Sequence, residues 1–283
     1  MTASPEVSAS INAAGITTNI HDSGTDPGGG TVLLIHGSGP GVSAWANWRL
    51  TIPALAQDFR VVAPDLTGFG FSDRAPACYT LSGWTAHALG VLDALGLERV
   101  SVIGNSFGGS IALSLAIHHP ERVNRLGLMG AVGVPFAITP GLDAVWGYEP
   151  SVEAMAELLR IFTATPSPGI DELARLRYEA STRPGVHEAY ASMFPAPRQR
   201  WVDAMAHPDE AISSIAAPTM LFHGREDRVI PMTTSLRLLD LIPDAQLHVF
   251  GNCGHWTQIE HADEFARLLR DFLLGPSMRY MRR

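Results

Sequence analysis

A serine between glycines stands at Gly104-Asn-Ser-Phe-Gly108, which has the pattern G-x-S-x-G. It follows the apolar run Val100–Ile103 and precedes the helical pattern of Ser110–His118. In this context the pattern is typical of a nucleophile elbow, whose small neighbours permit a strained turn that presents the serine hydroxyl. The helix beside it offers free N–H groups to developing negative charge. We predict that Ser106 is a nucleophile; the alternative is a glycine turn without chemistry.

A serine hydroxyl needs a base to take its proton, and the base needs a carboxylate to fix its tautomer. Asp227 and His255 each stand in a loop directly after an apolar, strand-like run. The chain order Ser106, Asp227, His255 is that of an α/β-hydrolase triad. Glu226 competes with Asp227 for the carboxylate role, whereas the end of the preceding strand-like run offers no carboxylate.

The segment His36-Gly-Ser-Gly-Pro-Gly41 follows the first clear apolar run, and its glycines allow two interpretations. A dinucleotide-binding G-x-G-x-x-G loop is disfavoured, because the third glycine would fall on Val42 and Pro40 lacks an N–H donor. In α/β-hydrolases this loop instead supplies one amide of the oxyanion hole, beside the amide that follows the nucleophile. We assign these amides to Ser38 and Phe107.

No metal site is predicted, since the chain has no H-E-x-x-H pattern. His118 and His119 are adjacent on a predicted helix, so they point about 100° apart, which disfavours a shared metal ion. His36 and His223 precede glycines at strand ends, where a buried imidazole can satisfy backbone groups. Cys253 lacks an elbow of its own, and we interpret it as a small buried residue rather than a nucleophile.

Short runs rich in Val, Ile and Leu alternate with helical patterns along the chain. This alternation implies a mostly parallel sheet covered on both faces, with sites beyond the carboxyl ends of its strands. The fold class we predict is the α/β-hydrolase fold: a mostly parallel eight-stranded sheet flanked by helices, with an inserted helical cap. The apparent runs are Thr31–Ile35, Phe59–Ala63, Val100–Ile103, Arg125–Met129, Thr219–Phe222 and Leu247–Phe250, and helical patterns include Trp84–Leu95, Ser110–His118 and Thr234–Leu241.

The alternation breaks between residues 134 and 211, where helical segments such as Val152–Phe162 and Asp171–Ala180 follow one another without a strand. We interpret residues 134–211 as a helical cap domain inserted into a core domain of residues 1–133 and 212–283. The large apolar residues of the cap either line a pocket or form the cap's own core, and the second explanation suits most of them. They are Trp146, Tyr148, Met155, Phe162, Met193, Phe194 and Trp201.

Composition narrows the class of protein. The 283 residues are 46% hydrophobic, which permits a substantial core, and the net charge of -8 disfavours nucleic acid and anionic membranes as partners. The first residues, Met1–Ala14, have neither a basic start nor a continuous apolar stretch, and no segment approaches the roughly 20 apolar residues of a membrane span. Cys78 and Cys253 indicate no disulfide framework. We therefore expect a cytoplasmic protein.

Five segments carry a more specific signal: His36-Gly-Ser-Gly-Pro-Gly-Val-Ser-Ala-Trp-Ala-Asn-Trp48, Gly104-Asn-Ser-Phe-Gly-Gly109, Trp146-Gly-Tyr-Glu-Pro150, Met193-Phe-Pro-Ala-Pro-Arg-Gln-Arg-Trp201 and Cys253-Gly-His-Trp-Thr-Gln258. They resemble the carbon–carbon bond hydrolases that act on meta-ring-cleavage products of aromatic degradation. The resemblance implies hydrolysis of a 2-hydroxy-6-oxohexa-2,4-dienoate, such as 2-hydroxymuconic semialdehyde or a 6-alkyl analogue. The products would be 2-hydroxypenta-2,4-dienoate and a small carboxylic acid, formed without cofactor or metal by a homo-oligomer.

The resemblance also implies contacts to the carboxylate and 2-hydroxyl of the dienoate from Gly39, Asn47, Asn105, Arg177 and Trp256. Arg177 can be argued from the sequence as well. Its neighbours at i±3 and i±4 on the predicted helix include no carboxylate and are largely apolar, so its charge favours an anion from elsewhere. The alternative is a surface arginine whose stem covers apolar neighbours. For Asn47 the alternative is a local turn or helix cap.

The implied reaction has two stages. His255, oriented by Asp227, helps move the dienol proton so that the carbon chain becomes a ketone. Ser106 then attacks the distal carbonyl, or assists a water molecule that attacks it, and the sequence leaves both routes open. A carboxylesterase or lactonase with the same triad is the alternative enzyme, against which Arg177 and the two asparagines argue. A ligand-binding homologue without turnover is the alternative outside enzymes.

Overall fold

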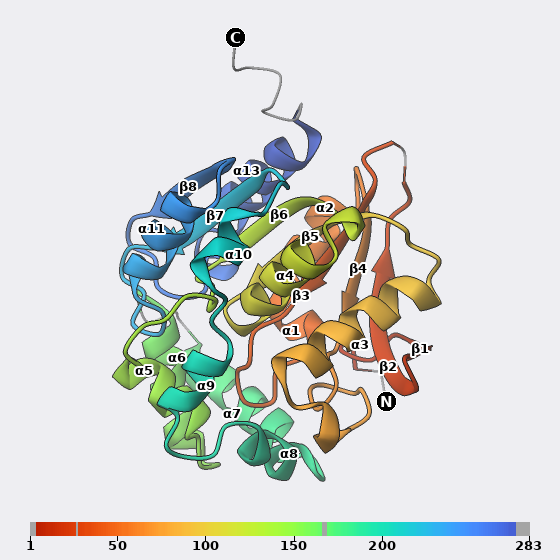
Figure 1. The fold of residues 1–283 in the computed structure, drawn as a ribbon. Helices are drawn as coiled ribbons and strands as arrows, with labels where there is room; N and C mark the ends of the chain where they lie inside the picture. Colours follow the sequence, from red (N-terminus) through yellow and green to blue (C-terminus); the bar gives the residue numbers. More distant parts are fainter. Residues whose placement is uncertain (1–3, 27, 166–168, 276–283) are drawn as a thin grey trace.

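The structure is a computed structural model and describes residues 4–26, 28–165 and 169–275. Its strands are β1 (Ala9–Ala13), β2 (Ile16–Ser23), β3 (Thr31–Ile35), β4 (Arg60–Pro64), β5 (Val100–Asn105), β6 (Val123–Met129), β7 (Thr219–Gly224) and β8 (Ala245–Phe250). They form one eight-stranded sheet in the order β1-β2-β4-β3-β5-β6-β7-β8 (Figure 1). Strand β2 runs antiparallel to β1 and β4, and the other pairings are parallel, so the predicted mostly parallel sheet is confirmed.

Each apparent apolar run is a strand, and the two strands without such a run are β1 and β2. In β2 the sequence Ile-Thr-Thr-Asn-Ile-His-Asp-Ser is mostly polar, so no continuous apolar signal exists there. Three of its polar side chains, Thr18, Asn19 and His21, are nevertheless buried and hydrogen-bonded. Periodicity therefore misses this strand because its burial is satisfied by hydrogen bonds rather than by apolar contact.

The helices cover both faces of the sheet, as predicted. They are α1 (Ala44–Trp48), α2 (Thr51–Leu55), α3 (Leu81–Ala94), α4 (Phe107–His118), α5 (Pro140–Trp146), α6 (Val152–Phe162), α7 (Ile170–Ser181), α8 (Val186–Met193), α9 (Gln199–Ala204), α10 (Asp209–Ser213), α11 (Met232–Leu241), α12 (Thr257–Glu260) and α13 (Ala262–Leu274), with 3-10 turns at Pro76–Cys78 and Pro120–Arg122. Successive residues of β3 face opposite layers: Val32 and Leu34 pack with α1, α2 and α13, and Leu33 and Ile35 with α3 and α4. Both faces are thus buried, which explains the continuous apolar runs.

Between β6 and β7 the described residues form helices α5 to α10 and no strand. The predicted segment Val152–Phe162 is α6 with the same bounds, and Asp171–Ala180 lies within α7. Figure 1 shows α5 to α9 gathered at one end of the sheet, whereas α10 lies beside α4 and α11. This insertion therefore lies over the loops that carry the predicted site residues.

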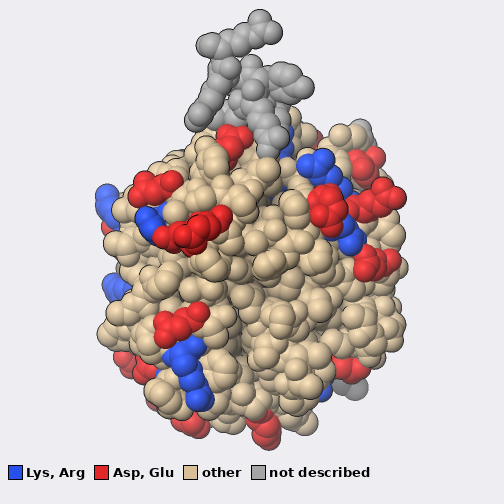
Figure 2. Space-filling model, in the orientation of Figure 1, with Lys and Arg blue, Asp and Glu red and all other residues tan. Residues whose placement is uncertain are grey.

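The surface offers few further signals. On the face shown in Figure 2, acidic and basic side chains of the described residues lie in small mixed groups separated by uncharged surface. Among the described residues, no helix combines the length and the apolarity that crossing a membrane requires.

The turn that carries the serine is packed without spare room. A Cβ atom on Gly104 would lie 2.3 Å from the carbonyl oxygen of Gly108, and one on Gly108 would lie 2.5 Å from the carbonyl oxygen of Ile35. Helix α4 thus begins in backbone contact with the end of β3. Because of this contact, the loop that follows β3 lies directly beside Ser106.

Gly108→Ala should destabilise the protein by about 1–3 kcal/mol, because the new methyl group meets backbone that cannot move independently. Chemical denaturation monitored by circular dichroism measures the loss. Gly251→Ala is the matched control, since its Cβ would make only ordinary contacts of 3.5 Å with the Arg225 side chain. Equal stability of the two variants would contradict the inferred tight packing.

Candidate active site

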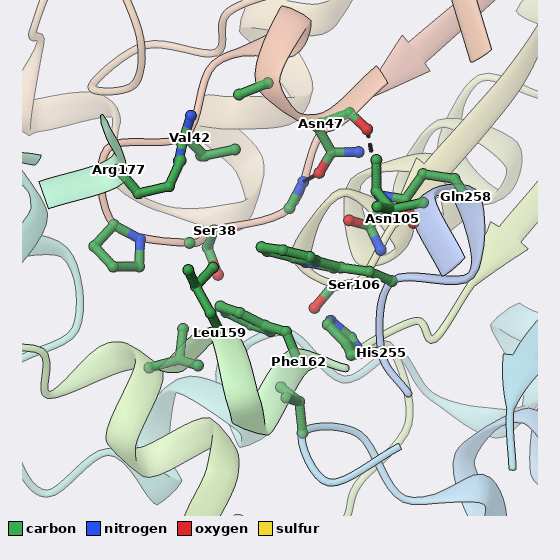
Figure 3. A pocket seen from close by; sticks show the side chains of 18 of the residues that line it. Ser38, Val42, Asn47, Asn105, Ser106, Leu159, Phe162, Arg177, His255 and Gln258 are labelled. Carbon is green, nitrogen blue, oxygen red and sulfur yellow. Dashed lines mark hydrogen bonds between the residues drawn. The ribbon is translucent and has the colours of Figure 1, made fainter. Parts of the chain in front are cut away.

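Ser106 lies at the junction of β5 and α4 with φ 53° and ψ -115°, a conformation that non-glycine residues rarely adopt. Its backbone is fixed from both sides: the N–H donates to the carbonyl of Met129 (2.8 Å), and the carbonyl accepts from the N–H groups of Gly109 (2.9 Å) and Val132 (3.0 Å). In Figure 3 the hydroxyl points toward the imidazole of His255. The strained turn is that of a nucleophile elbow.

His255 and Asp227 meet in the interior, where their side chains are 3% and 2% exposed. Nδ1 of His255 donates to Oδ2 of Asp227 at 2.7 Å. Because an ionised carboxylate only accepts hydrogen bonds, Nδ1 carries the proton and Nε2 is left to accept one from a hydroxyl. Burial raises the pKa of Asp227, but its attraction to His255 and the hydrogen bonds that it accepts outweigh this, and the net pKa lies below the usual value.

The carboxylate of Asp227 is held on its other side as well. Its Oδ1 accepts from the N–H groups of Val229 (2.7 Å) and Ile230 (2.9 Å). Gly130 leaves the space for the pair: a Cβ there would lie 3.1 Å from Nδ1 of His255 and 3.2 Å from Oδ2 of Asp227. The backbone of Gly130 is also left-handed, with φ 48°.

The competing residues have other partners. Glu226 accepts hydrogen bonds from the Cys253 backbone N–H (3.0 Å) and from Arg225 (2.8 Å), so it braces the loop rather than the imidazole. Cys253 is buried, and burial next to Glu260 raises the pKa of its thiol. A thiol with a raised pKa is a poor nucleophile at neutral pH. The geometry therefore favours Asp227 and Ser106 over both.

His36 and His223 are fully buried and bond to neighbouring polar groups, as predicted. His36 lies 2.7 Å from the carbonyl of Gly37 through Nδ1 and accepts the Leu66 N–H at 3.0 Å through Nε2, and burial lowers its pKa to about 4. His223 lies 3.0 Å from the carbonyl of Ile230 and 2.7 Å from the hydroxyl of Ser235. Within the described ranges, no group of three His, Cys, Asp or Glu side chains could hold a metal ion.

The two amides assigned to the oxyanion hole belong to Phe107, which follows Ser106 in the chain, and to Ser38, which lines the same pocket as Ser106. Phe107 is the first residue of α4, so its N–H has no hydrogen-bond acceptor within the helix. No acceptor among the described residues takes the N–H of Ser38, whose hydroxyl accepts from the Trp146 indole at 2.9 Å. Trp146 thus joins the insertion to this loop and fixes the Ser38 side chain.

A pocket opens onto Ser106 and His255, and its two ends differ in chemistry. In the view of Figure 3, Arg177, Asn47 and Gln258 lie above Ser106, and Leu159 and Phe162 lie below it. Apolar side chains from α5, α6, α7 and the loop after β7 are Leu142, Val145, Met155, Leu159, Phe162, Leu173 and Val229, and Pro40, Val42, Ala46, Trp256 and Ile259 come from the segments that also supply polar groups. Polar side chains come from the loops after β3 and β5 and from α1, α7 and α12: Ser38, Asn47, Arg49, Asn105, Arg177 and Gln258.

The chain is similar to known proteins over most of its length. The sequence profile described as "Alpha/beta hydrolase family" matches residues 32–268. A 2-hydroxymuconate semialdehyde hydrolase of Pseudomonas sp. (strain CF600) is 60% identical over 271 residues, covering 95% of each chain. A 2-hydroxy-6-oxo-2,4-heptadienoate hydrolase of Pseudomonas putida is 58% identical over 269 residues, covering 95% of this chain and 96% of the relative.

The solved structure of a meta-cleavage product hydrolase from Pseudomonas fluorescens IP01 has a TM-score of 0.93 and 55% identity to this chain. The match covers 95% of this chain and 98% of that one. The chain belongs to the meta-cleavage product hydrolases of the alpha/beta hydrolase family. The resemblance predicted from the five sequence segments and the predicted fold class are both confirmed.

Four of the five residues expected to contact substrate in this hydrolase line the pocket close to the serine. Asn105 precedes Ser106 and donates to the Met129 carbonyl at 3.3 Å. Asn47 is buried on α1, and Trp256 follows His255 with its ring stacked on Phe162 at 4.6 Å. Gly39 lies in the loop that follows β3 and also lines the pocket.

Arg177, the fifth, pairs with a carboxylate that sequence analysis did not find. Its Nη1 lies 3.4 Å from Oε1 of Glu6, and its Nη2 donates to the carbonyl of Gly41 at 2.6 Å. Glu6 is 171 residues away in the chain and also lies near Arg49 and Arg183, whose charges it partly offsets. The anion that Arg177 contacts in this structure therefore belongs to the N-terminal segment of the hydrolase itself.

Glu260 on α12 has a role that no pattern in the sequence indicated. Its two carboxylate oxygens accept from the backbone N–H groups of Gly254 (2.8 Å) and Ala164 (2.7 Å). The carbonyl of Phe162 accepts the His255 N–H at 2.7 Å, and the two rings stack with centroids 6.0 Å apart. The end of α6 is thus clamped to the loop that carries His255.

Most of the large apolar residues of the insertion do not line the pocket, but several of them pack against the α/β core rather than forming a core of the cap's own. Only Met155 and Phe162 of that set line the pocket. Phe194 instead joins a buried aromatic cluster with Trp84, Phe107 and Trp146, and Met193 and Tyr148 are buried as well. Trp201 lies at a separate groove beside α3 and α4.

Gly130→Ala should lower kcat/KM by roughly 10- to 100-fold, because the methyl group displaces the Asp227–His255 pair from its alignment. Steady-state kinetics on the favoured substrate measure the effect. Gly96→Ala is the control: its φ of 64° imposes the same left-handed strain, but its Cβ would meet nothing within 4 Å. Comparable activity in the two variants would show that Gly130 leaves no essential space.

Glu6→Gln should lower the KM for a carboxylate substrate by roughly three- to tenfold. The reason is that it removes a negative charge that competes with the substrate for Arg177, an interaction of about 1 kcal/mol. The gain should shrink as salt is added. KM measured at low and high ionic strength tests this, with Glu121→Gln in the 3-10 turn after α4 as the control. A higher KM would mean that Glu6 serves mainly to hold Arg177 in place.

Proposed function

We propose that this hydrolase cleaves a carbon–carbon bond in 2-hydroxy-6-oxohexa-2,4-dienoates such as 2-hydroxymuconic semialdehyde or its 6-alkyl analogues. The observation that carries the proposal is the position of Ser106 and His255 between the arginine end and the apolar end of one pocket. A substrate with a carboxylate at one terminus and an acyl carbon near the other fits this division. The names of the most similar relatives denote hydrolases of such compounds.

In the proposed complex the carboxylate of the dienoate lies at Arg177, with Asn47, Asn105, Gly39 and Trp256 around the first carbons. A guanidinium suits this role because its paired N–H donors match a carboxylate. His255, held in one tautomer by Asp227, moves the proton from the 2-hydroxyl toward C5. The chain then carries a ketone at C2 that can accept electrons from the bond to be broken.

Ser106 then attacks the C6 carbonyl while His255 takes its proton. The developing oxyanion accepts hydrogen bonds from the Ser38 and Phe107 amides. The C5–C6 bond breaks, its electron pair passes through the chain to the C2 oxygen, and 2-hydroxypenta-2,4-dienoate leaves after protonation. Water hydrolyses the acyl-serine to the carboxylic acid. A route in which water attacks first, with Ser106 assisting, uses the same groups.

The proposal includes the cap. Residues 134–211 would act as a cap domain over a core of residues 1–133 and 212–283, since the apolar pocket wall comes largely from α5 and α6. The uncharged side chains Leu142, Val145, Met155 and Leu159 favour small apolar 6-substituents over charged ones. The cytoplasmic location expected from the sequence and the homo-oligomeric assembly implied by the resemblance belong to the same proposal.

The test follows the loss of the yellow dienolate absorbance when purified protein meets 2-hydroxymuconic semialdehyde and its 6-methyl and 6-phenyl analogues. A p-nitrophenyl ester is assayed in parallel, for wild type and Ser106→Ala. We expect fast bleaching of the small dienoates and a loss of at least about 10³-fold in the variant, since the nucleophile is gone. Rapid ester turnover with inert dienoates would retain the triad and overturn the substrate class.

A further inference from the structure

Gln258, on α12 three residues after His255, presents a buried acceptor to the pocket. Its side chain is 1% exposed, and its Nε2 donates to the backbone carbonyl of Asn47 at 3.3 Å. That bond fixes the orientation of the amide, because a carbonyl can only accept. Oε1 is therefore the free atom, and no donor among the described residues bonds to it.

Asn47 presents the complementary donor. Its side chain is 7% exposed, and its Oδ1 accepts the backbone N–H of Gly37 at 3.2 Å, which fixes the orientation of this amide too. Nδ2 is left buried without an acceptor in the described part of the chain. Asn47 and Gln258 are joined through the backbone of Asn47, so a donor and an acceptor stand in one wall of the pocket (Figure 3).

A buried polar atom without a partner is costly, and a native site that retains two of them is suited to a ligand that satisfies both. A carboxylate would accept from Nδ2 but be repelled by Oε1, and an ether or a ketone would leave Oε1 unsatisfied. A hydroxyl group satisfies both at once, because its oxygen accepts one hydrogen bond and its proton makes another. The pair is thus suited to a neutral hydroxyl.

We propose that Gln258 is a substrate-positioning residue that accepts a hydrogen bond from the 2-hydroxyl of the dienoate while Asn47 donates to the same oxygen. This inference rests on the proposed function, since it takes the hydroxyl from that substrate. It assigns the pocket a preference for the neutral dienol over the dienolate and over 2-deoxy analogues. Once the proton has moved to carbon, the C2 oxygen still accepts a hydrogen bond from Asn47 but has no proton to donate to Gln258. The hydrogen bond to Gln258 is therefore made only by the bound substrate before proton transfer.

The experiment measures direct binding by calorimetry, so it does not depend on turnover. The ligands are pentanoate, 2-hydroxypentanoate and 2-methoxypentanoate, titrated into wild type and Gln258→Met, with Thr257→Val as the matched control. Thr257 is the buried neighbour on α12, its hydroxyl also lacks a partner among the described residues, and its side chain does not line the pocket. Thermal denaturation checks that each variant is folded.

In wild type, 2-hydroxypentanoate should bind about tenfold more tightly than pentanoate, and 2-methoxypentanoate should lose that advantage because it has no proton to donate. Gln258→Met should bring the ratio of hydroxy to deoxy affinity close to one, whereas Thr257→Val should leave it unchanged. The comparison of the three ligands on wild type stands even where Gln258→Met does not fold.

Equal wild-type affinities for the three ligands would overturn the inference, as would a ratio that persists in folded Gln258→Met. Either result with normal dienoate hydrolysis would leave the proposed function intact. A third result is also decisive: the dienoates are not hydrolysed, but the carboxylates bind with the predicted ratio of hydroxy to deoxy affinity. This result would overturn the proposed reaction and retain Gln258 as an acceptor of a hydroxyl proton.

Discussion

The 2.7 Å hydrogen bond between Asp227 and His255 is the contact on which the arrangement of the site depends. A carboxylate in the interior is tolerated only when it is paired, and Asp227 is paired with an imidazole on one side and two backbone N–H groups on the other. These contacts outweigh burial and keep its pKa below the usual value. The favourable contribution of the ionised carboxylate is therefore present at neutral pH and is lost as the pH falls through that lowered pKa.

The parallel sheet brings these groups together, because the carboxyl ends of β5, β7 and β8 lie at the same edge. The insertion supplies further contacts to the loop that carries His255. The carbonyl of Phe162 accepts the His255 N–H, and Glu260 ties Gly254 to Ala164. Because α6 also lines the pocket, one helix both contacts the proposed acyl end and supports the proposed base. Movement of the insertion would therefore change the position of His255 as well as the pocket wall.

The triad positions could be predicted from the sequence because each follows an apolar strand, and the geometry of parallel strands then requires them to converge. Asp227 was predicted with Glu226 as its competitor, since both follow β7 and the direction of the loop decides which reaches His255. Strand β2 was missed because it is polar, and Glu6 was missed because a contact across 171 residues leaves no periodic signal. The free acceptor of Gln258 depends on a carbonyl 211 residues away, so only the folded chain shows it.

The polar end of the pocket combines the positive charge of Arg177 with two amide groups whose hydrogen-bonding directions are fixed. An isolated buried guanidinium would be costly, and the pairing of Arg177 with Glu6 and the Gly41 carbonyl removes part of that cost without making the site apolar. Charge alone would attract any small anion to Arg177. The fixed amides of Asn47 and Gln258 add a requirement for hydrogen-bond direction, which an anion without a hydroxyl does not meet. In the proposed complex, recognition rests on two separate features of one ligand, and the uncharged opposite wall would select the 6-substituent by size and apolarity.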